Sequence, residues 1–248
     1  MIELVDVHKA FGPKQILRGL TLDVPEGQNT VMIGYSGTGK SVTLKCIVGL
    51  LVPDSGEVRV DGQVVSGLDP DELAALRGRI GYVFQSAALF DSMTVRENIA
   101  LGLRRRRLPD DDIAARIDES LDVVDLAEAG EKYPSELSGG MRKRVGVARA
   151  IALRPAYILY DEPTTGLDPV TSAIMDQLMV RTRDLGVTGL IVTHDMRTAF
   201  TAGDRVAMLY EGRIRQAGPA AEIRESDDPV VRQFIEGRPD ASHSAGRQ

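Results

Sequence analysis

A glycine-rich segment near the start of the chain has the residue types and order needed to hold a phosphate group. The pattern G-x-x-x-x-G-K-[ST] is met by Gly34, Tyr35, Ser36, Gly37, Thr38, Gly39, Lys40 and Ser41. The glycines let successive backbone N–H groups face one anion, and the following helix adds its positive N-terminal end. Lys40 can reach the β- and γ-phosphates, and the Ser41 hydroxyl can hold Mg²⁺. A simple turn with a solvent-facing lysine fits poorly, because an apolar run precedes the loop and helical spacing follows it.

An acidic pair follows a second apolar run. Residues 157–160 are apolar or aromatic and lead directly into Asp161 and Glu162. A carboxylate at the end of a buried strand is well placed beside phosphates held by a loop on a neighbouring strand. Asp161 is therefore predicted to hold the metal, directly or through water, and Glu162 to polarise a water for attack on the γ-phosphate. Without the phosphate loop, the pair could equally be a surface turn.

A third segment opens a predicted helix and is formed by Leu137, Ser138, Gly139, Gly140 and Met141. Its serine can cap the helix, and its two glycines expose backbone N–H groups, so it suits a second anion. The segment resembles the signature motif LSGGQ of the ABC transporter ATPases, with methionine in place of glutamine. In that family the signature of one subunit covers the γ-phosphate held by another. The resemblance therefore implies a homodimer with two shared sites.

Further residues match the same family in order along the chain. Gln85 resembles the Q-loop glutamine, which touches Mg²⁺ or water and senses the permease, and Asp168 resembles the D-loop aspartate. His194 resembles the switch histidine that contacts the γ-phosphate, although a lone histidine is more often structural. Phe11 matches the aromatic residue that stacks on adenine, and could instead be a core aromatic. The resemblance spans residues 1 to about 225.

The resemblance implies ATP and Mg²⁺ as cofactors and assigns three kinds of site residue. It implies catalytic roles for Lys40, Gln85, Glu162 and His194. It implies metal ligation by Ser41, Gln85 and Asp161. It implies nucleotide contacts from Phe11, Gly34, Tyr35, Ser36, Gly37, Thr38, Gly39, Lys40, Ser41, Val42, Leu137, Ser138, Gly139, Gly140, Met141 and Asp168.

Apolar runs and turn signals alternate along the chain and predict an α/β fold with a mostly parallel sheet. Strands are expected at 2–7, 15–24, 30–34, 79–85, 156–163, 190–195 and 205–218, with a hairpin at 56–65. Helices are expected at 40–51, 110–126, 138–153, from about 170 to 184, and at 229–236. Together with the resemblance, this indicates a P-loop NTPase with a RecA-like core, an N-terminal antiparallel β subdomain and an inserted helical lobe. The expected ATPase domain is 1–225, with the lobe at about 88–153, and 226–248 is a C-terminal extension with a short helix and a disordered tail.

Composition limits the partners and the location. The net charge of the 248 residues is −6, which gives no sign of nucleic acid as a partner. No stretch approaches about 18 uncharged apolar residues, so the chain is not expected to cross a bilayer. The single cysteine, Cys46, cannot form an intramolecular disulfide and is expected to be buried. We expect a peripheral protein on the cytoplasmic side of the inner (plasma) membrane.

Four stretches resemble one group within the family, the ATPases of Mla/Mce-type lipid transporters. They are residues 33–51, 85–100, 138–153 and 227–238. The resemblance implies integral membrane permease subunits, an Mce-type substrate-binding protein and a phospholipid or other hydrophobic cargo. The alternatives are an ABC importer or exporter for polar solutes, a soluble ABC-type ATPase of DNA repair or translation, and a nucleotide kinase. The last two fit poorly, since the chain has no coiled-coil insertion and carries both the signature segment and His194.

Three further segments carry expectations of their own. Residues 86–103 are expected to face the permease. The run Arg104–Arg107 is either a solvated helix face or a patch attracted to anionic lipid headgroups or an acidic permease loop. The tail after Ser226 either ends disordered or braces the dimer. A short docked helix is expected there because of the apolar residues Val230, Val231, Phe234 and Ile235.

Overall fold

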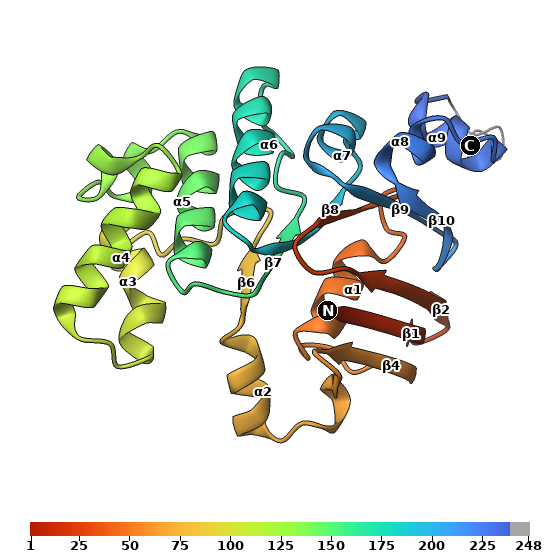
Figure 1. Ribbon diagram of the computed structural model, residues 1–248, viewed down its shortest axis with the longest axis horizontal. Helices are drawn as coiled ribbons and strands as arrows, with labels where there is room; N and C mark the ends of the chain where they lie inside the picture. Colours follow the sequence, from red (N-terminus) through yellow and green to blue (C-terminus); the bar gives the residue numbers. More distant parts are fainter. Residues whose placement is uncertain (239–248) are drawn as a thin grey trace.

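A six-stranded sheet forms the centre of the molecule (Figure 1). The computed structural model describes residues 1–238, so the tail expected beyond the last helix lies outside the described residues. The strand order is β10-β9-β3-β8-β7-β6, and the strands from β9 to β6 run parallel. The strands are β3 (Asn29–Ile33), β6 (Ile80–Val83), β7 (Tyr157–Asp161), β8 (Thr188–Thr193), β9 (Arg205–Tyr210) and the antiparallel β10 (Arg213–Pro219). The central strands are buried on both faces, which explains their continuous apolar runs.

The carboxyl ends of β3, β7 and β8 lie at one edge of this sheet. Strand β8 pairs in parallel with β3 on one side and with β7 on the other. The residues that directly follow these strands are therefore brought together, as expected for a parallel α/β sheet. They are the phosphate loop after Ile33, Glu162 after Asp161, and His194 after Thr193.

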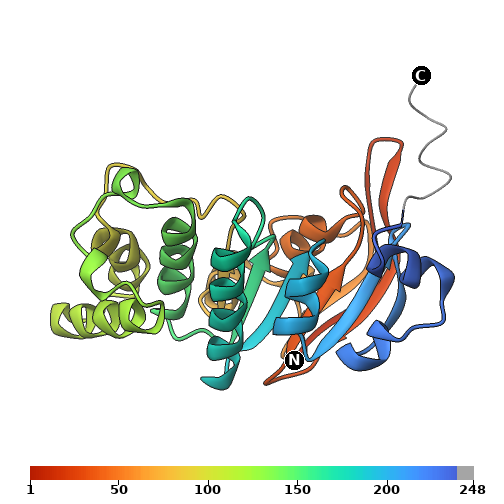
Figure 2. The same ribbon diagram turned by 90° about the horizontal axis from the view of Figure 1, so that it is seen from above.

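A second, antiparallel sheet of four strands has the order β2-β1-β4-β5. Its strands are β1 (Ile2–Phe11), β2 (Lys14–Val24), β4 (Ser55–Val60) and β5 (Gln63–Val64). The hairpin predicted across Asp61 and Gly62 is confirmed, because both residues have positive φ angles, 50° and 78°, as its two-residue turn requires. Figure 2 shows the β1–β2 hairpin projecting from the body of the molecule. The structure thus confirms the α/β class with an N-terminal antiparallel subdomain.

Helix α1 (Lys40–Ile47) shares a core with both sheets. Leu44, Cys46 and Ile47 pack in this core, and burial raises the pKa of the Cys46 thiol to about 11. The sequence predicted a helix to residue 51, which is wrong at its end. The helix ends at Ile47 because Gly49 adopts a φ of +64°, a left-handed conformation that terminates helices.

Most of the other helices form a row over the other face of the six-stranded sheet and continue into a lobe (Figures 1 and 2). The lobe holds α3 (Val95–Arg105), α4 (Asp110–Val123) and α5 (Gly139–Ile151). Nearer the sheet lie α6 (Pro169–Asp184), α7 (Met196–Ala202), α8 (Ala220–Arg224) and α9 (Pro229–Ile235). Short 3-10 turns occur at Val65–Gly67, Ala127–Ala129 and Pro134–Glu136. Within residues 1–238, no helix combines the length and apolarity that a membrane span requires.

Among the short helices that were not anticipated from the sequence are α2 (Pro70–Arg77) and α7. Helix α2 begins with a capping box in which Asp69 accepts from the Glu72 N–H and Glu72 accepts from the Asp69 N–H. Helix α7 begins at the Asp195 cap, directly after His194. Both helices span about two turns, which is too short for apolar periodicity to show, so only their caps could have revealed them.

A buried carboxyl group lies in helix α6, close to α7. Asp176 has no exposed surface. Burial raises the pKa of its carboxyl, the Thr198 hydroxyl partly offsets this, and the charges of Asp195 and Arg197 act in opposite directions. Because the folded-state pKa is raised, the folded protein holds this proton more tightly than the unfolded chain. Its contribution to stability is therefore complete at low pH and is lost as pH rises through the folded-state pKa.

Replacing Asp176 with asparagine is expected to remove this loss. Between the unfolded-state and folded-state pKa of Asp176, each pH unit lowers the free energy of unfolding of the wild type by up to about 1.4 kcal/mol. The variant retains this stability because asparagine does not titrate. Urea unfolding at a series of pH values from 4 to 8 would measure the difference. Equal pH dependence in the two proteins would show that Asp176 titrates normally.

Candidate functional site

The phosphate loop connects β3 to α1, and its first and last glycines combine a positive φ with close neighbours. A Cβ at Gly34 (φ +155°) would lie 2.4 Å from the Leu209 carbonyl oxygen. A Cβ at Gly39 (φ +112°) would lie 2.8 Å from the Leu17 side chain. Any side chain at these positions would force the loop away from β9 or β2. The loop can therefore keep its N–H groups available to an anion only with glycine at both positions.

Lys40 is held against the loop by its own ammonium group. Its Nζ donates to the carbonyl oxygens of Gly34 (2.7 Å) and Tyr35 (3.2 Å), and lies 3.5 Å from Glu162 Oε1. Burial lowers the pKa of Lys40, and the neighbouring Glu162 carboxylate opposes that shift. A cation is thus fixed at the mouth of the loop, where a phosphate oxygen could replace the weaker carbonyl contacts.

Ser41 and Asp161 meet beside the loop and fit a magnesium ion. Ser41 Oγ donates to Asp161 Oδ1 at 2.7 Å, and the Tyr82 hydroxyl donates to Asp161 Oδ2 at 3.0 Å. Hydroxyl and carboxylate oxygens are hard donors, which Mg²⁺ prefers. Sequence reasoning missed Tyr82, which orients the carboxylate from the neighbouring strand β6. Burial and the Asp161 charge raise the pKa of Tyr82, so its hydroxyl stays a donor.

Glu162 lies at the convergence of three polar groups. Its Oε2 is 2.8 Å from His194 Nδ1 and accepts from Thr165 Oγ1 at 3.1 Å, while Lys40 approaches Oε1. Glu162 also has a φ of +50°, a conformation that costs a non-glycine residue about 1–3 kcal/mol. The fold thus retains a strained backbone to hold this carboxylate, which could accept a proton from a water molecule. Thr165 was not anticipated from the sequence.

Gln85 lies on the same side of the sheet, shortly after β6. It is exposed, and it shares a cavity of about 590 Å³ with Asp161, Thr165, Lys45 and Phe84. The structure therefore places Gln85 near the candidate metal ligands, with its side chain open to solvent.

Phe11 lies at the tip of the projecting hairpin and is 48% exposed, which argues against a core aromatic. Its ring is 5.8 Å from the ammonium of Lys9. Nearby residues of the same hairpin, Lys14 to Ile16, line a cavity of about 320 Å³ with Tyr35 and Thr38 of the phosphate loop. The hairpin therefore lines one side of the cavity beside the phosphate loop, and its tip carries the exposed ring of Phe11.

The signature segment lies at the start of α5, in the helical lobe rather than beside α1 (Figure 1). Ser138 caps α5 by accepting from the Met141 N–H at 3.2 Å. The Leu137 side chain is buried, and Met141 packs against the core, so the backbone and Ser138 remain for an anion. Val42 likewise packs against a core, between the two sheets.

Gly140 lets the signature segment contact the residues after Asp168. A Cβ at Gly140 would lie 2.2 Å from Thr171 Cγ2. Asp168 caps α6 by accepting from the Val170 and Thr171 N–H groups, each at 3.0 Å, and from the Thr171 hydroxyl at 2.5 Å. The predicted Asp168 thus lies close to the signature segment, because it caps the helix turn that holds Thr171.

Lys143 connects the signature helix to residues 162–165 and was missed by sequence reasoning. Its buried Nζ donates to the Thr165 carbonyl at 2.6 Å and reaches the Glu162 carbonyl at 3.5 Å. Burial lowers the pKa of Lys143, and the Glu162 carboxylate opposes that shift. In the sequence, Lys143 looks like the other basic residues of α5. Its buried contacts become visible only in the folded structure.

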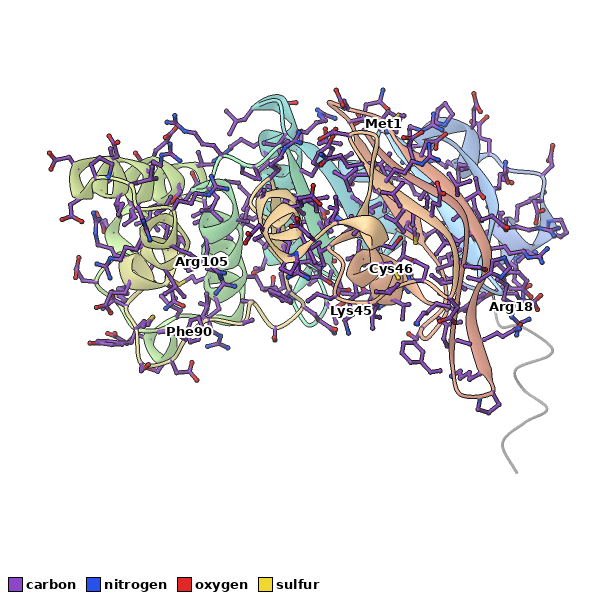
Figure 3. The ribbon with its side chains drawn as sticks, turned by 90° about the horizontal axis from the view of Figure 1, so that it is seen from below. Met1, Arg18, Lys45, Cys46, Phe90 and Arg105 are labelled. Carbon is purple, nitrogen blue, oxygen red and sulfur yellow. The ribbon has the colours of Figure 1, made fainter. Side chains whose placement is uncertain are left out.

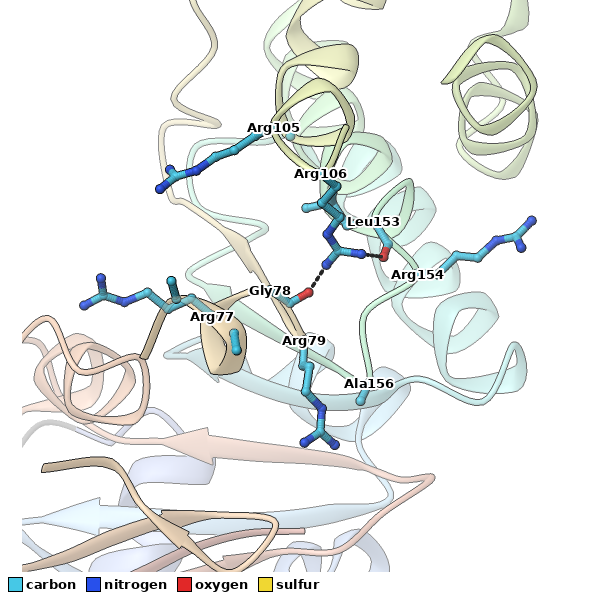
Figure 4. A pocket seen from close by; sticks show the side chains of 11 residues that line it. Arg77, Gly78, Arg79, Arg105, Arg106, Leu153, Arg154 and Ala156 are labelled. Carbon is cyan, nitrogen blue, oxygen red and sulfur yellow. Dashed lines mark hydrogen bonds between the residues drawn. The ribbon is translucent and has the colours of Figure 1, made fainter. Parts of the chain in front are cut away.

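The run Arg104–Arg107 begins in the last turn of α3 and borders a pocket of about 770 Å³ (Figure 4). Arg106 is structural: it donates to the Leu153 carbonyl at 2.8 Å and to the Gly78 carbonyl. Five arginines line the pocket, but in Figure 4 the guanidinium groups of Arg79 and Arg154 point away from each other. The exposed residues of the run fit a solvated helix end.

Comparisons with known proteins agree with this geometry. The sequence profile of the family described as "ABC transporter" matches residues 17–165. The chain is 42% identical over 239 residues to the probable ribonucleotide transport ATP-binding protein mkl of Mycobacterium leprae, covering 96% of this chain and 69% of that protein. It is 43% identical over 256 aligned residues to the protein TRIGALACTOSYLDIACYLGLYCEROL 3, chloroplastic, of Arabidopsis thaliana, covering 96% and 74%.

A solved structure with a similar fold contains hydrolysis products. It is the dimeric structure of a post-hydrolysis state of the ATP-binding cassette MJ0796 bound to ADP and Pi. The TM-score is 0.81 at 33% identity, with 89% of this chain and 99% of that chain covered. Because profile, relatives and fold all agree, the chain belongs to the ABC transporter family, as one of its ATP-binding and ATP-hydrolysing subunits.

Proposed function

We propose that the protein powers lipid transport by an Mla/Mce-type ABC transporter, as a homodimer on the cytoplasmic side of the inner (plasma) membrane. The observation that carries the catalytic part of this proposal is the convergence on Glu162 of Lys40, His194 and Thr165. These contacts place a cation, a carboxylate and an imidazole around one point at the end of the central strands.

Each residue of this cluster has a distinct proposed role. Lys40 and the loop N–H groups bind the β- and γ-phosphates. Ser41 and Asp161, with Gln85 nearby, hold Mg²⁺, which when bound neutralises phosphate charge. Glu162 orients the attacking water and accepts its proton, and His194 donates to the transferring phosphoryl group. Most of the rate enhancement then comes from positioning and electrostatics.

The signature segment supports the homodimer. It offers the Ser138 hydroxyl and the first N–H groups of α5, yet it lies in a different part of the same chain from the phosphate loop (Figure 1). A second copy, placed head-to-tail, would bring this segment over the γ-phosphate and form two shared sites. The dimeric MJ0796 cassette, with ADP and Pi bound, supports such an arrangement.

An exposed apolar surface supports a membrane partner. Leu50, Phe84 and Phe90 are 57%, 39% and 50% exposed, and Leu50 and Phe84 line the cavity that contains Gln85. Phe90 projects from the lobe on the same side of the molecule as Lys45 in Figure 3. We propose that permease subunits dock here, so that Gln85 connects their movement to the ATP site.

The lipid cargo rests on resemblance to the Mla/Mce-type ATPases, and an Mce-type substrate-binding protein would complete the complex. The name of the Arabidopsis relative, TRIGALACTOSYLDIACYLGLYCEROL 3, includes a lipid and supports this choice. A second candidate, transport of a polar solute, is favoured by the name of the mycobacterial relative, which refers to ribonucleotide transport.

Co-purification in mild detergent is expected to separate these candidates. The wild-type protein should bring down a permease with bound phospholipid, and the double variant Phe84→Asp, Phe90→Asp should lose at least about 90% of it, since each buried charge would cost several kcal/mol. Leu185→Asp places the same charge on a more exposed leucine, 62% exposed, at the end of α6 and should retain the partner. Recovery of a solute-type permease, with ATPase activity stimulated by ribonucleotides and unaffected by lipid, would overturn the lipid assignment.

A further inference from the structure

An aromatic pair joins the C-terminal helix α9 to the phosphate loop. Phe234 packs edge-on against Tyr35, with 4.8 Å between ring centroids and 81° between ring planes. The ring of Tyr210, at the end of β9, also lies near Tyr35, at 6.5 Å. Tyr35 directly follows the first glycine of the phosphate loop, so a residue far along the chain touches the loop that holds ATP.

Tyr35 also organises the loop through its backbone. Its carbonyl oxygen accepts from Thr38 Oγ1 at 2.8 Å, from the Thr38 N–H at 3.4 Å and from Lys40 Nζ at 3.2 Å. A displacement of Tyr35 would therefore move the turn and the lysine together. The loop can bind phosphate tightly only if these groups are already in place, because ordering them on binding would cost affinity.

Helix α9 is firmly attached to the body of the protein. Asp228 caps it by accepting from the Val230 N–H at 2.9 Å and the Val231 N–H at 3.3 Å, and pairs with Arg215 at 2.8 Å. Val231 has no exposed surface and belongs to the main core. Phe234 is therefore presented to Tyr35 from a fixed support.

We propose that Phe234 is a positioning residue for ATP, which acts through Tyr35 to hold the phosphate loop in its binding conformation. This inference rests on ATP binding and is independent of the proposed cargo and permease. Loss of the Phe234 ring is expected to weaken MgATP binding about two- to tenfold, the range that a T-shaped aromatic pair supplies. The turnover number should change little, because Phe234 touches none of the catalytic groups.

The test compares four variants by titration with a fluorescent ATP analogue, by steady-state ATPase kinetics and by thermal unfolding. Phe234→Ala should raise Kd and KM without a matching fall in kcat. Phe234→Tyr should restore binding because it keeps the ring. Val230→Ala, in the same helix and packed on the same core, should lower thermal stability without affecting Kd. Tyr35→Ala should weaken binding at least as much as Phe234→Ala.

The double variant Tyr35→Ala, Phe234→Ala decides whether Phe234 acts through Tyr35. If it does, the double variant binds MgATP no more weakly than Tyr35→Ala alone. The proposal is overturned if the two effects add, or if Val230→Ala weakens binding as much as Phe234→Ala does. Absence of ATP binding by the wild type would instead contradict the family function, so the two failures are distinguishable.

Discussion

Replacing Glu162 with glutamine is expected to lower kcat about 10²- to 10⁴-fold while leaving MgATP binding nearly unchanged. Glutamine has the size of glutamate and can keep the contact with the Thr165 hydroxyl, but its amide cannot accept the proton of the attacking water. Single-turnover hydrolysis would measure the fall in rate, and an equilibrium titration would measure binding. The variant should also accumulate as an ATP-bound dimer, which size-exclusion chromatography with MgATP can detect.

A matched control is available in Glu211. This residue also has a positive φ, 48°, but it is exposed and lies in the β9–β10 turn. Glu211→Gln removes the same charge from a similar backbone and should hydrolyse ATP at the wild-type rate. The proposed role of Glu162 would be wrong if its glutamine variant turned over as fast as this control.

Replacing Lys40 with alanine is expected to weaken MgATP binding about 10- to 100-fold. This is the loss of affinity expected when a charge-assisted hydrogen bond to a phosphate oxygen is removed. The change also leaves the carbonyls of Gly34 and Tyr35 without this donor. Burial lowers the pKa of Lys40, which shows that burying its charged ammonium group is unfavourable. The alanine variant avoids this unfavourable desolvation. The variant should therefore remain folded, and thermal unfolding without nucleotide would verify this.

Arg224→Ala provides the comparison, since Arg224 is exposed and lies in α8, outside the cavity that contains Gln85 and Asp161. It should reduce the net charge equally without changing nucleotide affinity by more than about twofold. Similar Kd values for the two variants would mean that Lys40 does not contact phosphate.

Sequence reasoning located the features that are formed by neighbouring residues in the chain. The phosphate loop and the acidic pair at Asp161 are read from consecutive residues that follow apolar strands, and parallel pairing of β3, β8 and β7 then brings them together. The two-residue turn at Asp61 was predictable for the same reason, because its residue types match its positive φ angles.

Contacts between distant elements could not be read from the sequence. Tyr82 donates to Asp161 from the adjacent strand, and Lys143 donates to the Thr165 carbonyl from the signature helix. Phe234, in the last helix, packs against Tyr35. None of these side chains differs in type or spacing from ordinary helix or strand residues. Their roles arise only when the elements pack, so a pattern search has no signal to detect.

The burial of Cys46 makes the protein convenient for distance measurements by spin or fluorescent labels. Its thiol is inaccessible and its pKa is raised to about 11, so thiol-directed reagents should leave it unmodified in the native state. No other cysteine occurs in the sequence, and a cysteine engineered at an exposed position can be labelled selectively without first removing the native one.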